Sequence, residues 1–182
     1  MTGTRRILIG ALGAAILVLL WIAVAGRGGA AEVSTVRPDP ASAFTVDHVV
    51  DGDTIRATPA DASAREIAGV DESVRVRLIG IDTPEMRPEP ECGADAATER
   101  LQKLLPEGAT VWAAPDRDTH DRYERLLLYL WTEDGTFVNE TLIVDGHASA
   151  LEVAPNDTYA ERFAAAEETA RRDGAGRWGA CG

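Results

Sequence analysis

Five short segments of the chain read as strands, and along residues 44–50 and 74–81 hydrophobic and polar residues alternate as they do in strands that bury one face. These segments span residues 44–50, 53–58, 74–81, 110–114 and 126–131. Three further segments have helical composition, and they span residues 94–105, 138–145 and 157–172. A proline follows the first of these helices, a glycine follows the second, and Asp157 or Thr158 caps the third. The pattern therefore predicts an α+β domain.

Turn residues separate these elements. An Asp-Gly pair predicts a tight turn between the first two strands, and three prolines in residues 84–93 predict a loop there. Residues 59–73 are small and acidic, and we expect a long hairpin loop. One helix after the third strand and two after the fifth predict a five-stranded antiparallel barrel of the oligonucleotide-binding type (OB-fold) with three helices.

Residues 1–31 differ from the rest of the chain. Two arginines precede an uncharged apolar run of 19 residues, 7–25, which as a helix would be about 28 Å long, close to the thickness of a bilayer core. Small residues at 23–25 and 29–31 are typical of signal-peptide cleavage sites. A cleaved signal peptide and an uncleaved N-terminal membrane anchor both stay open. Either one predicts an extracytoplasmic protein, secreted or anchored to the cell membrane.

The chain is acidic. Its formal net charge is −12, and residues 1–31 hold three arginines and no acids, so the remainder has 15 basic and 30 acidic side chains and a charge of −15. That remainder divides into a linker at residues 32–43 and one domain at residues 44–182. The negative charge argues against loose, sequence-independent binding of nucleic acid, which depends on a basic surface. It leaves room for a local basic site.

Two cysteines, Cys92 and Cys181, suit an extracytoplasmic compartment. In an oxidising space an even pair is more often bridged than free. A disulfide would close a loop of about 90 residues and stabilise the fold by roughly 4–5 kcal/mol in the chain-entropy model. Two unrelated buried thiols are the alternative. The cysteines and the three histidines never reach zinc-site spacing, which excludes a structural zinc site.

Acidic side chains stand where two predicted strands meet turns. Asp53 and Asp82 occupy such positions, and Thr83 follows directly. Carboxylate and backbone carbonyl oxygens are the ligands that Ca²⁺ prefers, so these two aspartates and the Thr83 carbonyl could hold this cation with water and a substrate phosphate. A simple turn role is the alternative for each aspartate alone. Glu85 lies three residues after Asp82 and could take a proton from a water molecule, or it could be solvated surface.

Arginines accompany these acids. Arg77 and Arg125 lie in or beside apolar strands, and Arg75 shares a strand face with Arg77. A guanidinium binds phosphate oxygens in a fork that lysine cannot match, whereas surface ion pairs are the alternative role. A hard cation, a carboxylate for the water and guanidinium groups for developing charge together suit phosphodiester hydrolysis.

Three motifs in register carry a family resemblance. Residues 51–54 read Asp-Gly-Asp-Thr, residues 77–85 read Arg-x4-Asp-Thr-Pro-Glu, and residues 121–125 read Asp-x-Tyr-x-Arg. In this order they resemble the thermonuclease (staphylococcal-type nuclease) family, over about residues 44–178. The resemblance implies an oligonucleotide-binding barrel with three helices and Ca²⁺-dependent hydrolysis of DNA and RNA.

The resemblance also implies residue roles. Asp53, Asp82 and the Thr83 carbonyl would be the metal ligands, and Glu85 would be the general base. Arg77 and Arg125 would stabilise the transition state. Arg122 and Tyr123 would contact a terminal phosphate.

Three positions depart from the family pattern. Glu124 stands where glycine is common, and Leu151 and Val153 stand where the best-known member has tyrosines near the nucleotide base.

From the motifs and the N-terminal segment together we expect an exported or membrane-anchored, monomeric, Ca²⁺-dependent nuclease acting on single-stranded or locally melted DNA or RNA. If residues 7–25 remain uncleaved, the membrane is a further partner. A non-catalytic OB-type binding module of the cell envelope is the alternative, although such a module has no need for the full set of acids and arginines.

Overall fold

The computed structural model describes residues 37–181 of the chain. The expected signal peptide or anchor at residues 1–31, and residues 32–36 of the linker, lie outside the described residues. Among the residues described, no helix is both long and apolar enough to cross a membrane.

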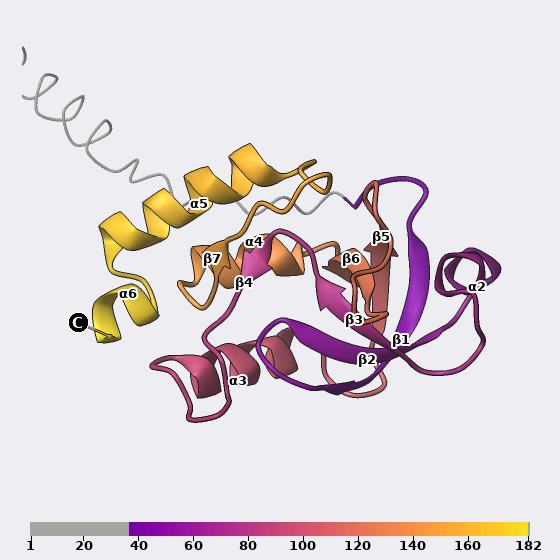
Figure 1. Cartoon of the computed structure of the whole chain (residues 1–182), viewed down its shortest axis with the longest axis horizontal. Coiled ribbons are helices and arrows are strands. Elements are labelled where there is room, and N and C mark those ends of the chain that lie inside the picture. Colours follow the sequence, from indigo (N-terminus) through magenta and orange to yellow (C-terminus); the bar gives the residue numbers. More distant parts are fainter. Residues whose placement is uncertain (1–36, 182) are drawn as a thin grey trace, which may run out of the picture. The chain divides into compact units, whose positions relative to one another are not determined.

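A closed barrel forms the centre of the described domain (Figure 1). Its strands are β1 (Ser42–Val49), β2 (Thr54–Pro59), β3 (Val74–Leu78), β5 (Thr110–Ala114) and β6 (Leu126–Thr132). They follow one another around the barrel in the order β1-β2-β3-β6-β5. The predicted OB-type barrel is therefore confirmed.

The expectation of a purely antiparallel barrel is wrong. Four neighbouring pairs are antiparallel, but β3 and β6 run parallel, with Val76 opposite Leu126 and Leu78 opposite Leu128. The reason is topological, because β5 closes against β1 and its partner β6 then returns beside β3 in the same direction. Local patterning cannot indicate which distant strands become neighbours.

The helices agree with the sequence pattern in part. The three expected ones are present as α3 (Ala94–Leu104), α4 (Val138–Val144) and α5 (Ala160–Asp173), the last beginning three residues later than expected. A short α6 (Arg177–Ala180) follows α5. Two elements that the pattern did not predict, β4 (Ile81–Asp82) and β7 (Ser149–Ala150), pair as a small antiparallel sheet beside the barrel.

The predicted hairpin loop at residues 59–73 is also wrong, because it contains α2 (Ala62–Ala68). The Asp61 carboxylate caps this helix by accepting the backbone N–H of Ala64 at 2.7 Å. Gly69 ends the helix with a left-handed φ of 71°. Both capping signals were present in the sequence, and the acidic composition of the segment obscured them.

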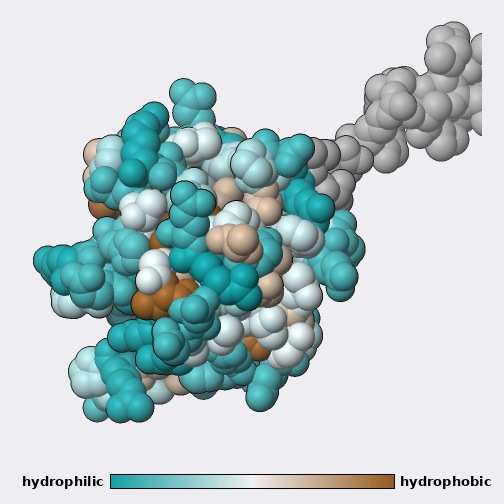
Figure 2. All heavy atoms as spheres, turned by 90° about the vertical axis from the view of Figure 1, so that its right-hand side faces the viewer, coloured by the Kyte–Doolittle hydropathy of each residue, from teal (hydrophilic) through white to brown (hydrophobic). Residues whose placement is uncertain are grey.

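Alternate side chains of the barrel strands point inward and form the core, together with apolar faces of α3, α4 and α5. Aromatic rings from β6, from α5 and from the residues just before α4 and α5 pack against one another; Trp131 and Phe137, for example, are buried in the core and stack with centroids 4.6 Å apart. The face that lies at the right of Figure 1 is largely hydrophilic, with apolar atoms in small separate patches (Figure 2). The acidic composition is thus expressed on the surface while the core stays apolar.

One buried amide and one glycine direct the chain from β3 into β4. The fully buried Asn139 donates to the Ile79 carbonyl at 2.8 Å and accepts the Leu130 N–H at 3.0 Å. Gly80 follows with a φ of 79°, and a Cβ there would come within 2.5 Å of the Phe163 ring. This turn delivers residues 81–85 to the end of β3.

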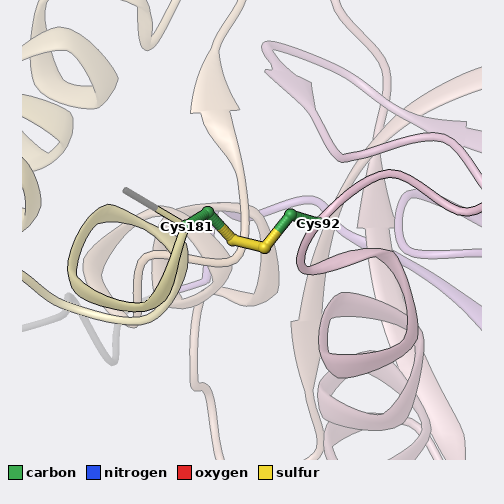
Figure 3. Close-up of a disulfide and its surroundings, with 2 residues drawn as sticks. All are labelled: Cys92 and Cys181. Carbon is green, nitrogen blue, oxygen red and sulfur yellow. A yellow bond between two sulfur atoms is a disulfide. The ribbon is translucent and has the colours of Figure 1, made fainter.

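Cys92 and Cys181 are joined in a disulfide, with their Cα atoms 5.9 Å apart (Figure 3). The bond connects the loop before α3 to the residue after α6. It closes a loop with a sequence separation of 89. The C-terminal end of the described chain is thereby attached to the loop that follows Glu85.

We expect Cys92→Ser combined with Cys181→Ser to lower the free energy of unfolding by roughly 4–5 kcal/mol, because the unfolded chain regains the entropy of an open loop. This loss should lower the melting temperature by roughly 10–20 °C. Thermal melting of the double variant and of the parent with and without a thiol reductant measures the effect. Equal melting temperatures for all three samples would contradict it.

Candidate active site

Asp53 lies at the centre of the candidate site, in the turn between β1 and β2, and is only 7% exposed. Its Oδ2 accepts the backbone N–H of Thr83 at 3.2 Å and the Thr83 hydroxyl at 3.0 Å. Burial raises the pKa of Asp53 above its ordinary value and nearby Asp51 raises it further, whereas Arg77 and the Thr83 hydrogen bonds offset only part of the rise. The carboxylate is thus held rigidly where burial favours its protonated form and the adjacent Arg77 favours its ionised form.

Gly52 allows this close approach. A Cβ at this position would lie 2.7 Å from the Thr83 hydroxyl oxygen and 2.9 Å from the Cβ of Ala97. Any larger residue would therefore separate the turn from residues 82–83. The Asp-Gly-Asp-Thr motif is explained by contact between the first hairpin and the chain after β3.

Arg77 connects the two predicted metal-binding carboxylates. Its Nη2 lies 3.1 Å from Oδ2 of Asp53 and 3.3 Å from Oδ1 of Asp82. Its Nη1 donates to the carbonyls of Leu78 and Ile81, both at 2.9 Å. The Arg77 side chain is 13% exposed, so it both supports the local fold and presents positive charge to the site.

The donor set around Asp53 and Asp82 fits a hard cation. Both carboxylates converge on one nitrogen of Arg77, and neither cysteine nor histidine takes part. Within residues 37–181 no group of three or more His, Cys, Asp or Glu side chains is arranged to hold a metal ion. Two carboxylates leave most of a Ca²⁺ shell to carbonyl, water or phosphate oxygens, which Ca²⁺ accepts.

Glu85 begins the loop beyond this site and is exposed. Its backbone is held by a reciprocal pair of hydrogen bonds: the Glu85 N–H donates to the Glu91 carboxylate at 3.1 Å, and the Glu91 N–H donates to the Glu85 carbonyl at 2.9 Å. The carboxylate of Glu85 itself has no hydrogen bond or ion pair with residues 37–181. It is therefore available to water or substrate, three residues from Asp82.

Asp121 positions the second arginine. Its carboxylate accepts Nε of Arg125 at 2.6 Å and the backbone N–H groups of Tyr123 and Arg125 at 2.8 and 2.9 Å. Burial raises the pKa of Asp121, but hydrogen bonds from Arg125 and Tyr123 outweigh it and lower the pKa below its ordinary value. This role of Asp121 was not predicted from the sequence. An aspartate in a turn, whose carboxylate can accept the backbone N–H two residues later, is the signal that could have revealed it.

Arg122 and Tyr123 extend from the same turn. The Arg122 guanidinium lies 4.7 Å from the centre of the Tyr123 ring and donates to its hydroxyl at 2.6 Å. The Tyr123 ring is largely exposed. Both side chains are therefore accessible to a ligand next to Arg125.

A pocket of about 500 Å³ brings the arginines together. Arg77, Arg122, Tyr123 and Arg125 line it, whereas Asp53, Asp82, Thr83 and Glu85 do not. Leu151, Val153, Asp118, His120 and Asn156 also line the pocket, and the last three were not predicted from the sequence. Asp53 and Asp82 lie next to this pocket, because both contact Arg77, which lines it.

The chain is similar to known proteins. The family model described as "Staphylococcal nuclease homologue" matches residues 75–180, more than half of the chain. The chain belongs to the staphylococcal nuclease family. The matched region contains Arg77, Asp82, Glu85 and Arg125 and begins after Asp53.

Individual family members show the same similarity. A thermonuclease of Staphylococcus intermedius is 34% identical over 170 residues, which cover 92% of this chain and 93% of that protein. The endonuclease YncB of Bacillus subtilis is 33% identical over 143 residues, 76% of this chain and 62% of that protein. The prophage-derived endonuclease YokF of the same organism is 34% identical over 139 residues, 74% of this chain and 43% of that protein. The match thus spans less than two thirds of both B. subtilis relatives.

Glu124, a departure from the family pattern, has a left-handed φ of 59°. A side chain in this conformation is strained, whereas glycine is not. We expect Glu124→Gly to raise the free energy of unfolding by roughly 0.5–1 kcal/mol. Urea unfolding measures the change. Glu107→Gly is the matched control, because it also removes an exposed acid but at a negative φ, and we expect it to be neutral or destabilising. Equal destabilisation by both variants would contradict the prediction.

Proposed function

We propose that this domain is a Ca²⁺-dependent nuclease that hydrolyses phosphodiester bonds of DNA, RNA or both. The observation that carries the proposal is the position of Arg77. This side chain contacts both predicted metal-binding carboxylates and lines the same pocket as Arg125. Family membership supports the class of reaction, since the relatives named above are thermonucleases and endonucleases.

A scissile phosphate in the pocket would contact both arginines. Negative charge builds on its equatorial oxygens in the transition state, and preorganised guanidinium groups stabilise that charge most strongly there. Asp121 holds the Arg125 fork in place, and Asp53 and Asp82 hold Arg77. Asp53, Asp82 and the Thr83 carbonyl would hold Ca²⁺, which when bound polarises phosphate oxygens and lowers the pKa of water. Glu85 would accept the proton of the attacking water.

A terminal phosphate of the substrate would bind Arg122 and Tyr123. Arg122 has no carboxylate within ion-pair distance among residues 37–181, and its guanidinium and the Tyr123 hydroxyl both supply donors beside the pocket. Leu151 and Val153 supply aliphatic surface in the same pocket. Aliphatic contacts stack less strongly on bases than aromatic rings do, which favours modest affinity and weak base preference.

Export is the second part of the proposal. A disulfide persists in an oxidising compartment and is rare in a reducing one, which supports an extracytoplasmic location. The apolar residues 7–25 would direct export as a cleaved signal or retain the protein as a membrane anchor. The domain would act as a monomer.

A non-catalytic binding module of the cell envelope is the second candidate, and the net charge favours it, because an acidic surface repels nucleic acid. The two candidates differ in one measurable respect. A nuclease releases acid-soluble fragments from denatured DNA, whereas a binding module does not.

We expect hydrolysis of denatured DNA to require Ca²⁺, to be weak with Mg²⁺ and to cease in chelator. Mg²⁺ demands near-ideal octahedral geometry, which two carboxylates at the edge of a loop do not impose. Fragment release is measured in each metal, and Ca²⁺ is restored after chelation as a control for irreversible loss. Full activity in chelator would contradict a metal-dependent mechanism.

We expect Glu85→Gln to lower kcat/KM by about 10²–10⁴-fold, because the amide cannot accept a proton. Glu89→Gln is the matched control, since Glu89 is an exposed acid of the same loop. Both variants should melt at the temperature of the parent, because the Glu85 carboxylate has no partner within residues 37–181. An equal loss of activity in both variants would show that loop charge, rather than proton transfer at Glu85, matters.

We expect Arg125→Lys to lower kcat/KM by roughly 10²-fold, because lysine keeps the charge but loses the planar fork. Arg171→Lys is the matched control, as Arg171 also pairs with an acid four residues earlier but lies on α5. Arg77→Ala is less suitable, because it would remove the Arg77 donors from two carbonyls and two carboxylates and destabilise the fold. Near-parental turnover of Arg125→Lys would contradict the assigned role.

A further inference from the structure

Two arginines face each other across the β2–β3 pair. Arg56 of β2 is directly opposite Arg75 of β3 in the antiparallel register. Directly opposite residues on one face have Cβ atoms about 4.5–5.5 Å apart, and like charges in such positions are destabilising. Both side chains leave the outer face of the barrel, because their neighbours Ile55 and Val76 are buried.

Neither arginine forms an ion pair with an acid of the described residues. Within residues 37–181, Arg56 and Arg75 have no carboxylate within 4.0 Å, whereas Arg77 and Arg125 are both paired. Arg56 donates to the carbonyl of Ser73 at 3.3 Å and to its hydroxyl at 3.5 Å. The chain has 30 acidic and 18 basic side chains, yet these two adjacent arginines form no ion pair with a described acid.

Asp47 is the one acid in this hydrogen-bond network, and it bonds to two hydroxyl groups rather than to an arginine. Asp47 accepts the hydroxyls of Thr58, at 3.0 Å, and Ser73, at 2.5 Å. His48, the next residue, is exposed and lies opposite Arg56 in the register of β1 and β2. The row His48–Arg56–Arg75 across three strands therefore contains donors and no carboxylate.

This row begins beside the active site. Arg75 is two residues before Arg77 on β3, so the two side chains leave the same face of the strand about 6.6 Å apart. Arg77 lines the pocket, and Thr54 is its partner on β2. The pair Arg56–Arg75 is the next row of the sheet, one step away from the pocket.

We propose that Arg56 and Arg75 form a second phosphate-binding subsite, which holds the nucleic acid strand beyond the phosphate bound in the pocket. The inference rests on the proposed nuclease function and specifies how a strand lies on the domain. Phosphate oxygens would bind the two guanidinium groups and remove the repulsion between them. Contacts to phosphates carry no base information, so the subsite raises affinity for longer strands of any sequence.

The experiment compares a dinucleotide with a single-stranded decanucleotide of the same base as substrates. The double variant Arg56→Gln/Arg75→Gln should reduce the kcat/KM advantage of the decanucleotide roughly tenfold, mainly through KM, because two phosphate contacts are lost. Binding of the decanucleotide is measured by fluorescence anisotropy at several salt concentrations. The slope of log K against log salt should become less steep by about 1.4, or about 0.7 for each phosphate on a single strand.

The matched control is Arg65→Gln/Arg171→Gln, which removes the same charge from two exposed arginines that are paired with acids. This control should keep both the length advantage and the salt slope of the parent. The Arg56/Arg75 double variant should melt at or slightly above the parental temperature, since a like-charge pair has been removed. A lower melting temperature would show that the arginines serve the fold and would overturn the proposal.

The outcomes separate this proposal from the one on which it rests. If the parent cleaves both substrates and the Arg56/Arg75 variant keeps the length advantage and salt slope, the subsite is wrong and the nuclease proposal stands. If the parent cleaves no nucleic acid, the nuclease proposal fails. Decanucleotide binding then tests the subsite alone, and equal affinity in the parent and the double variant would overturn it.

Discussion

The Arg77 guanidinium contacts groups from three segments of the chain: the Leu78 carbonyl at the end of β3, the Ile81 carbonyl and Asp82 carboxylate of β4, and the Asp53 carboxylate of the first hairpin. A guanidinium supplies five donors in one plane, and a lysine ammonium could not satisfy these acceptors together. The same contacts keep the two carboxylates close to each other despite their repulsion. The geometry of the acids therefore depends on an arginine that also faces the pocket.

At Arg125 the arrangement is reversed, because here an acid, Asp121, positions the arginine. Asp121 accepts three hydrogen bonds from the turn that begins β6, and two of them come from backbone groups. Glu124 in this turn has the left-handed conformation that lets the backbone curl around Asp121. Both arginines are thus fixed before any ligand binds, which reduces the entropy lost when a phosphate is bound.

The domain is strongly acidic, and its arginines differ from place to place in whether they are paired with acids. The chain has 12 more acidic than basic side chains, and most arginines of the described residues are paired with acids. Among the described arginines without an ion pair are Arg122 at the pocket and Arg56 and Arg75 in the row beside it. An acidic body limits non-specific binding, while a few uncompensated guanidinium groups can still attract one strand to one place.

Much of this protein was predictable from local pattern, because side-chain alternation and helix periodicity are properties of neighbouring residues. The five barrel strands and three helices were found in this way, whereas the cysteine pair was inferred from composition and the three motifs were identified by their family resemblance. The parallel pairing of β3 with β6 and the small β4–β7 sheet were not, since they join residues far apart in sequence. The role of Asp121 and the opposition of Arg56 to Arg75 likewise arise only when the backbone folds and sets the register, because a side chain's partners are determined by three-dimensional proximity.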